Sequence, residues 1–577
     1  MIDKKTLPII IILGLLILFY FPIMEFLGIY EPAKPDQATG EKSVATADSA
    51  APGTWQQPSV DSVWEPVDQP SEVATTPIDT VATENLIDDT IIVKTNMFTA
   101  VLTSFGGGLR SLELAEYAYR DGRPIQMLPE SQHATPEATF AGGTFSTSQV
   151  SFSCDHEAGI YDATGEPLDL VYTYGTAELG MIVRKYRFYP DDYHFDLILE
   201  TTNASRLGFE RQYRLVWNTP LGVTEPQANS DYETMEALAM QGGSRVTLDD
   251  YEDDRLNQSV EGYTSWAGVR SKYFAAVLIP HNRVGVGVVA QGEKRQVTTP
   301  DGGIEQRRIT AGISMEFASV VDVSDSFAVF VGPLDYTLMS KYHVDLEDML
   351  GIGTTPFIGW LIKPFALGII WLLPRMYELT PNYGVVIILF ALLVKLITLP
   401  LSMKSFQSMN AMKELQPKME ELKKKHKKNP QALNAEMMKL YKSHGVNPMS
   451  GCLPMLPQMP LFFALFSVFR STILLRDAPF IWFINDLSCG ATSLTDPYII
   501  LVVLMVGTQF ISQRFTMAST TQQNKILMYV FPFFMGWLLY KFPAGLVLYW
   551  TCFSMFALVD YLLFKRKKKK NEQVKTA

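Results

Sequence analysis

Hydrophobic residues follow different patterns in different parts of the chain. Apolar runs lie between residues 7 and 24 and, separated by short polar segments, after residue 355. Between about 90 and 345, apolar residues instead alternate with polar ones. A run of about 20 apolar residues is long enough to cross a bilayer as a helix, whereas alternation is typical of strands with one buried face. We therefore predict an all-β domain followed by an α-helical polytopic membrane domain.

The apolar runs and the lysines together predict a topology of six spans. The first is an anchor at 1–30, and a core at 381–564 holds five more, at about 382–402, 454–475, 498–515, 526–540 and 546–564. Short basic segments stay in the cytoplasm. The lysines of the N-terminus, of segment 403–450 and of tail 565–577 then fall on one side. Both termini are expected in the cytoplasm, and residues 31–380 outside it.

Three segments outside the core have distinct compositions. Residues 1–30 share a basic start and an apolar run with a signal peptide, but no small-residue cleavage site follows, which favours an uncleaved anchor. Segment 31–89 is rich in Pro, Ala, Thr and Asp, and we interpret it as a flexible acidic linker. Segment 355–380 is apolar but interrupted by Lys363-Pro364. If it crossed the membrane, the following helix would run the other way and the lysine-rich segment would lie outside the cytoplasm. We therefore expect an interfacial amphipathic helix.

The region 90–345 predicts an antiparallel β-sandwich. Turn signals such as Asp301-Gly302-Gly303 separate short strands. Candidate strands are Phe98–Thr103, Leu168–Tyr174, Met181–Tyr189, Phe209–Trp217 and Phe274–Ile279, with a solvated acidic loop around Asp249, Asp250, Glu252, Asp253 and Asp254. The histidines are isolated and the four cysteines have no paired spacing. We expect no catalytic residues, no metal and no cofactor.

Lys395 lies well inside the predicted span 382–402, about 20 Å from its outer end at 1.5 Å per residue. An ionisable residue within a span is costly and marks a functional site by default, although a lysine can also snorkel to the headgroups. Thr398 and Ser402 follow on the same helix face. In span 498–515 the cytoplasmic half carries Thr508, Gln509, Ser512 and Gln513, and Gln458 begins the span before it. Polar groups at one depth in three helices favour a groove open to the cytoplasm.

Two basic segments follow the spans. Lys423, Lys424, Lys425, Lys427 and Lys428 belong to a helical hairpin turning at Asn429-Pro430, and Lys565, Arg566, Lys567, Lys568, Lys569 and Lys570 form the tail. Topology alone explains lysines near membrane ends. Six consecutive cations exceed that need, and a phosphate-rich ribosome surface or anionic lipids are both candidate partners. We expect no DNA partner.

Several motifs resemble the YidC/Oxa/Alb family of membrane protein insertases. They are Asn447-Pro448-Met449-Ser450-Gly451-Cys452-Leu453-Pro454, Gln458-Met459-Pro460 and Phe542-Pro543-Ala544-Gly545-Leu546-Val547-Leu548-Tyr549-Trp550. The first anchor and large outer domain resemble the Gram-negative branch. The resemblance implies an inner-membrane protein with a periplasmic domain, which inserts nascent membrane proteins alone or with the Sec translocon. It also implies that Tyr549 and Trp550 line the groove, and that Lys395 stands where the family commonly has arginine.

Two other classes fit the sequence less well. An ion- or proton-coupled transporter would pair a buried lysine with a membrane-embedded acid, and the spans after Lys395 contain none before Asp560, near the inner end of the last helix. An intramembrane protease would need a nucleophile with its base, or two aspartates at matched depth. Arg470, near the outer end of its helix, has no assigned role.

Overall fold

The computed structural model describes residues 89–129, 133–140, 144–178, 180–203, 212–225, 228–299, 302–317, 322–354, 358–426, 429–446, 455–516 and 522–576. The predicted anchor 1–30 and nearly all of the linker 31–89 lie outside these residues, as do Lys427, Lys428 and the motif Asn447–Pro454.

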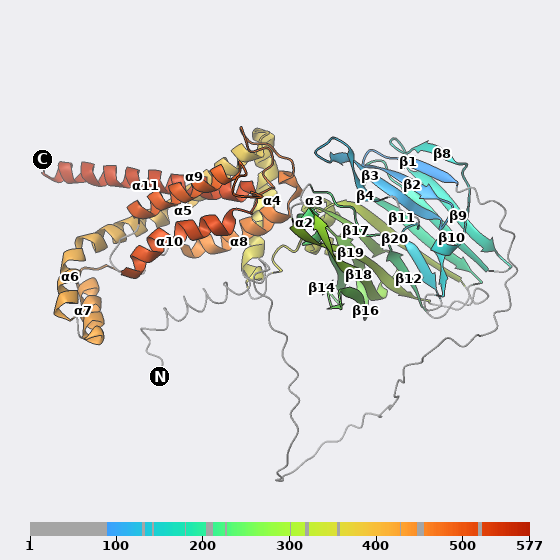
Figure 1. The fold of residues 1–577 in the computed structure, drawn as a ribbon, viewed down its shortest axis with the longest axis horizontal. Coiled ribbons are helices and arrows are strands. Elements are labelled where there is room, and N and C mark those ends of the chain that lie inside the picture. Colours follow the sequence, from blue (N-terminus) through green and yellow to red (C-terminus); the bar gives the residue numbers. More distant parts are fainter. Residues whose placement is uncertain are drawn as a thin grey trace, which may run out of the picture. The chain divides into compact units, whose positions relative to one another are not determined.

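The N-terminal part of the described chain is a β domain of two sheets (Figure 1). The smaller sheet has the order β4 (Pro124–Leu128), β3 (Gly108–Ala118), β2 (Phe98–Thr103), β1 (Thr90–Lys94) and β8 (Gly159–Asp162). The larger sheet has the order β6 (Phe145–Ser146), β5 (Glu137–Phe140), β12 (Gln212–Trp217), β19 (Gly302–Glu316), β18 (Gly285–Thr299), β16 (Arg255–Arg270), β17 (Phe274–Pro280), β20 (Asp322–Pro333), β11 (His194–Thr202), β10 (Gly180–Phe188), β9 (Leu168–Thr176) and β7 (Ser153–Cys154), with β13 (Glu236–Gln241), β14 (Ser244–Leu248) and β15 (Tyr251–Glu252) beside β16.

The alternation in the sequence is the cause of this architecture. In β11, Phe195, Leu197 and Leu199 are buried while the residues between them are half-buried, as expected for a strand with one face in a core. The pairing is antiparallel throughout the larger sheet. The smaller sheet departs from the prediction at one pair, because β8 runs parallel to β1.

The C-terminal part is helical. It contains α4 (Gly359–Leu379), α5 (Tyr383–Glu414), α6 (Gln416–Lys425), α7 (Pro430–Ser443), α8 (Met455–Ser471), α9 (Ile499–Thr516), α10 (Gln522–Leu539) and α11 (Ala544–Thr576). Short helices α2 (Ala228–Tyr232) and α3 (Tyr336–Met339), and 3-10 turns at Thr147–Gln149, Ser340–Tyr342, Leu346–Leu350 and Ile473–Leu475, complete the fold. Helix α11 packs against α5 and α9, α10 packs against α9, and α4 packs against α8. In Figure 1, α4 runs across the end of the long helices rather than along them.

Hydropathy identifies two described helices that are long and apolar enough to span a membrane, Tyr383–Glu414 and the Ala544–Leu562 part of α11. The apolar parts of α9 and α10, Ile499–Phe515 and Tyr529–Leu539, are shorter.

Two helices extend further than the sequence predicted. Helix α5 continues through Pro400 to Glu414 instead of ending near residue 402. Helix α11 includes the basic tail up to Thr576, although the predicted span ends at residue 564. The tail contains neither glycine nor proline, and lysine and arginine are good helix formers, so nothing in its composition ends the helix.

The N-terminal end of α5 is fixed by a cap and by a close contact. The Asn382 side chain accepts a hydrogen bond from the Val385 amide at 3.1 Å, as an N-cap residue does. Gly384 lies against the Phe480 ring, and a Cβ at this position would come within 2.0 Å of that ring. The segment between α8 and α9, here called the outer loop (residues 472–498), therefore packs directly onto the start of α5.

The same outer loop is joined to the β domain by ion pairs. Arg476 contacts Glu225 at 2.7 Å, and both side chains are buried, 6% and 2% exposed. The Arg476 guanidinium also donates to the carbonyls of Ala118 and Thr224 at 3.2 and 3.3 Å. Burial raises the pKa of Glu225 above its ordinary value, and the charge of Arg476 opposes that rise.

A second ion pair at this junction is of a different kind. Arg120 contacts Asp486 at 2.9 Å, but its side chain is 51% exposed. Asp486 also accepts hydrogen bonds from the backbone amide and the hydroxyl of Ser488, at 2.8 and 2.7 Å. Burial acts to raise the pKa of Asp486, but hydrogen bonds from Ser488, Cys489 and Arg120 outweigh it, and the pKa lies below its ordinary value.

These two pairs generate a matched test of what holds the junction together. Arg476→Ala removes the ion-paired cation of the buried Glu225 and leaves it only the charge of Lys272, so it should cost up to about 3–5 kcal/mol. Arg120→Ala should cost about 0–1 kcal/mol. The unfolding midpoint of the full chain in detergent measures both. In Arg476→Ala the raised pKa of Glu225 makes the folded state favour a proton, so stability should fall further as pH rises above 4.5, the ordinary pKa of a glutamate. Equal effects of the two substitutions would contradict this account.

Candidate functional site

Lys395 is buried in the helical bundle and is not alone. Its side chain is 6% exposed, and its ammonium nitrogen lies 3.2 Å from a carboxylate oxygen of Asp560, whose side chain is 13% exposed. The ammonium also lies 4.8 Å from the centre of the Phe553 ring. Asp560, noted in the sequence as an acid near the inner end of the last helix, is therefore the ion-pair partner of Lys395. Burying either charge alone at this depth would be costly. The packing of α5 against α11 places the two opposite charges in contact.

An aromatic layer lies next to this ion pair. Phe553 and Asp560 are seven residues apart on α11 and therefore share a helix face, with Tyr549 one turn earlier. The ring of Tyr549 lies 5.9 Å from that of Phe553 and 6.0 Å from that of Phe390 on α5. The ammonium consequently has an aromatic surface on the side toward the start of both helices.

Buried polar atoms without a protein partner identify further residues of the site. Within the described helical part, from residue 358 on, such side-chain atoms occur on four residues besides the ion-paired Asp560: Gln509, Gln513, Tyr549 and Trp550. All four are groove residues predicted from the sequence. A buried polar atom left unpaired costs roughly 1–3 kcal/mol, so these atoms need water or a polar segment as a partner. These residues lie on α9 and α11, and both helices pack against each other, so they define the candidate site described below.

The remaining predicted groove residues contribute less. The Thr398 hydroxyl donates to the carbonyls of Val394 and Lys395 at 3.0 and 3.2 Å, and the Ser402 hydroxyl donates to the Thr398 carbonyl at 3.1 Å. Their donors are thus used within α5 itself, which leaves only acceptor capacity. Ser512 is buried and Gln458 is half-buried. Among the described residues, no hydrogen bond or ion pair joins Lys395 to Gln458, Gln509 or Gln513.

Asp560 and Phe553 are the site residues that sequence reasoning missed. Asp560 was noticed as an acid near the inner end of its helix, but nothing in the sequence showed that it faces α5. The available signal was its spacing from Tyr549 and Phe553, which places all three on one helix face. Arg470, left without a role, is half-buried and interacts electrostatically with Glu233 and Glu236 of the β domain.

The basic residues lie on the parts of the helices distant from the β domain (Figure 1). Lys424 and Lys425 at the end of α6 are exposed, Lys423 is half-buried, and Lys565 on α11 is exposed. Met419 of α6 is buried, and the Tyr441 hydroxyl of α7 lies 3.7 Å from its sulfur. This contact closes the hairpin that the sequence predicted around Asn429-Pro430.

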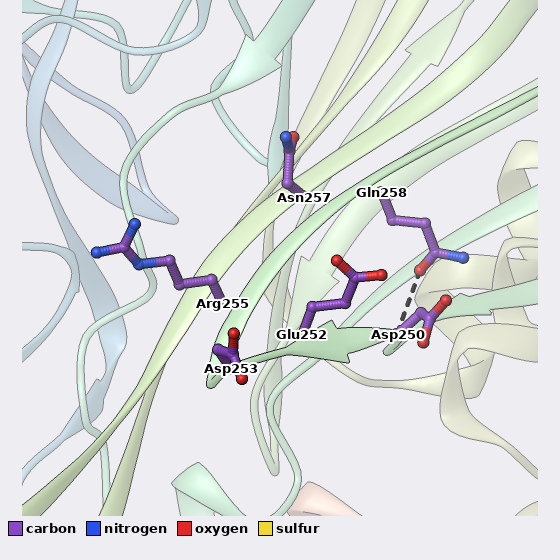
Figure 2. Close-up of a pocket in the computed structure, with 6 residues that line it drawn as sticks. All are labelled: Asp250, Glu252, Asp253, Arg255, Asn257 and Gln258. Atoms are coloured by element: carbon purple, nitrogen blue, oxygen red, sulfur yellow. Dashed lines mark hydrogen bonds between the residues drawn. The ribbon is translucent and has the colours of Figure 1, made fainter. Parts of the chain in front are cut away.

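The described part of the β domain contains two surface hollows. Figure 2 shows one of about 550 Å³, lined by Asp250, Glu252, Asp253, Arg255, Asn257 and Gln258. The acidic residues of this loop are exposed, which confirms the prediction of a solvated loop. A larger hollow of about 770 Å³ has a polar lining on β5, β12, β16, β18 and β19. Among the described residues, no group of three or more His, Cys, Asp or Glu could hold a metal ion.

Comparisons with known proteins cover both halves of the chain. The family model described as the YidC periplasmic domain matches residues 90–367, and the model described as the 60Kd inner membrane protein matches residues 375–572. Membrane protein insertase YidC of Chlorobium luteolum is 34% identical over 488 residues, 81% of either chain. The protein of the same name from Syntrophus aciditrophicus is 30% identical over 563 residues, 95% of this chain and 96% of its own.

Among solved structures, a crystal structure of an active YidC insertase with its first transmembrane domain resolved covers 82% of this chain and 92% of its own, with 20% identity and a TM-score of 0.33. The family models and the curated relatives carry the assignment. The chain belongs to the YidC family of inner-membrane proteins, whose curated relatives are named membrane protein insertases.

Proposed function

We propose that the chain inserts nascent membrane proteins through a groove between α5, α9 and α11 that opens to the cytoplasm and is closed toward the periplasm. The observation that carries this proposal is the set of buried polar atoms on Gln509, Gln513, Tyr549 and Trp550, beside the Lys395–Asp560 ion pair. In a lipid environment such atoms need water or polar segments of another chain, since lipid offers no hydrogen bonds.

The depth of these residues supports a shared groove. Counted from the start of each helix at 1.5 Å per residue, Lys395 lies about 18 Å along α5, and Gln509 and Gln513 lie about 15 and 21 Å along α9. In the proposed topology of six spans, with both termini in the cytoplasm and residues 31–380 periplasmic, α5, α9 and α11 all run inward. Helix α4 then lies at the periplasmic interface. The polar residues of α5 and α9 occupy the cytoplasmic half of the membrane.

The proposed mechanism lowers a barrier and needs no nucleotide. A polar segment of a client pays about 2.5–3.5 kcal/mol for each charged residue at the centre of a bilayer. A half-depth polar groove shortens the apolar distance and supplies hydrogen-bond partners. The client's own apolar helix then moves into lipid, which provides the driving force.

The partners follow from this role and from the basic surfaces. Nascent membrane proteins are the substrates, with the chain acting alone or beside the Sec translocon. The cations at 423–428 and 565–570 face the ribosome or anionic lipid headgroups in the proposed topology. The alternative of an ion- or proton-coupled transporter is not favoured by the named relatives, which are insertases, although the Lys395–Asp560 pair is a buried charge pair of the kind that a transporter could use. Solute uptake into proteoliposomes tests it.

Reversing the charge of Lys395 tests the electrostatic part of the proposal. Lys395→Glu places a second carboxylate beside Asp560 and should reduce insertion of clients with acidic translocated segments about tenfold or more. Lys395→Arg keeps the cation and should be tolerated. Insertion is measured as protease protection of the client in proteoliposomes, with a client lacking acidic residues as the control. Normal insertion of the acidic client by Lys395→Glu would contradict the electrostatic role.

The basic tail generates a separate prediction. Detergent-solubilised protein should bind ribosomes at low salt, and binding should weaken steeply as salt rises because affinity comes from counterion release. Replacing the six cations at 565–570 with glutamine should weaken binding and flatten its salt dependence. Cosedimentation with ribosomes measures this, and vesicles with and without anionic lipid form the parallel experiment. Ribosome binding that is unaffected by salt and by the substitution would leave the tail a role in topology or lipid contact.

A further inference from the structure

The ion pair in the groove contains an acid whose role the proposed function does not explain. In the described apolar parts of α5 and α8–α11, up to Lys565, Asp560 is the sole acid apart from Glu414 at the end of α5. Its carboxylate lies 3.2 Å from the Lys395 ammonium, and the Phe553 ring, seven residues earlier on α11, lies on the same ammonium. Helix α11 therefore supplies both the ring that covers the Lys395 ammonium and the carboxylate that neutralises its charge.

Neighbouring rings fix the position of Asp560. The ring of the next residue, Tyr561, lies 5.8 Å from that of Phe406 on α5 and 6.0 Å from that of Phe515 on α9. The segment of α11 that carries the acid is thus held between the two other helices of the groove. Its carboxylate faces Lys395 of α5, one residue before the ring that also contacts α9.

The geometry of the pair is that of a weak, exchangeable contact. A buried ion pair is strong when good geometry and further hydrogen bonds satisfy both partners. Here the Asp560 oxygen nearest the ammonium has Lys395, at 3.2 Å, as its single polar partner among the described residues, and no further hydrogen bond supports the pair. Lysine is a point charge without the bidentate fork of arginine, so another carboxylate can replace the first without loss of geometry.

We propose that Asp560 is a specificity-determining residue of the groove, which competes with the carboxylates of a client for Lys395. This inference rests on the proposed function. In the resting state Asp560 neutralises Lys395, and an acidic client segment pairs with Lys395 by displacing it. Asp560 thus lowers the preference of the groove for acidic segments, and it offers a carboxylate to basic ones.

A charge series of one client tests this competition. The series carries no acid, one acid or two acids in its translocated segment, and the readout is the ratio of protease-protected acidic client to protected neutral client. Asp560→Asn removes the competitor and should raise this ratio about two- to fivefold, because a client carboxylate no longer has to displace Asp560 from Lys395. Asp560→Glu keeps the charge and should leave the ratio near that of the original chain. Lys395→Gln combined with Asp560→Asn removes both charges and should make the ratio independent of the number of acids.

The outcomes separate the two claims. If no variant and not even the original chain inserts the neutral client, the proposed function fails. If the neutral client is inserted and Asp560→Asn leaves the ratio unchanged or lowers it, the competition is wrong and Asp560 is a structural partner of Lys395. If Asp560→Asn does not accumulate in the membrane, the double variant, which has no unpaired charge, decides. A ratio that still depends on client acids in the double variant would overturn the inference.

Discussion

The arrangement of the helical part depends on one constraint: a charged group among apolar helices must find a partner. Lys395 meets this constraint through Asp560 and the ring of Phe553, all on the contact between α5 and α11. The same contact brings Tyr549 against Phe390, which places an aromatic layer beside the pair. The polar ends of Gln509 and Gln513 on α9 have no such partner among the described residues. The two charges of the bundle are therefore paired, whereas polar atoms of α9 lack a protein partner. A site for a polar client requires such free hydrogen-bonding atoms.

A different constraint operates at the periplasmic end in the proposed topology. The outer loop packs Phe480 on Gly384 at the start of α5, and it carries Arg476 into the buried pair with Glu225 of the β domain. The start of α5, which positions Lys395 further along, is thus connected through one loop to the β domain. The β domain has no reactive cluster among its described residues, and its polar junction with the outer loop is its clearest connection to the rest of the chain.

The sequence predicted the elements better than their contacts. Alternation in residues such as Phe195, Leu197 and Leu199 was sufficient for the β domain, and hydropathy with a polar N-cap at Asn382 was sufficient for α5. Depth along a helix follows from counting residues, so the polar residues of α5 and α9 could be matched in advance. Which faces of two helices meet does not follow from counting. The partners Lys395 and Asp560 are far apart in the sequence, as are Arg476 and Glu225, and both pairs depend on packing. Two helix ends were also predicted too early. Pro400 does not end α5, which continues to Glu414, and the basic tail continues α11 to Thr576.

The central claim is that a client's polar segment occupies the groove while it crosses. Site-specific crosslinking of stalled nascent chains tests it most directly, with a photoreactive residue placed at Gln513 and, as the matched control on the same helix, at Val503. Val503 is 63% exposed on the apolar surface of α9, whereas Gln513 lies at the groove. The account predicts adducts between Gln513 and the polar segment of the client, with Val503 forming adducts only with its apolar helix. Equal crosslinking of the polar segment from both positions would contradict it.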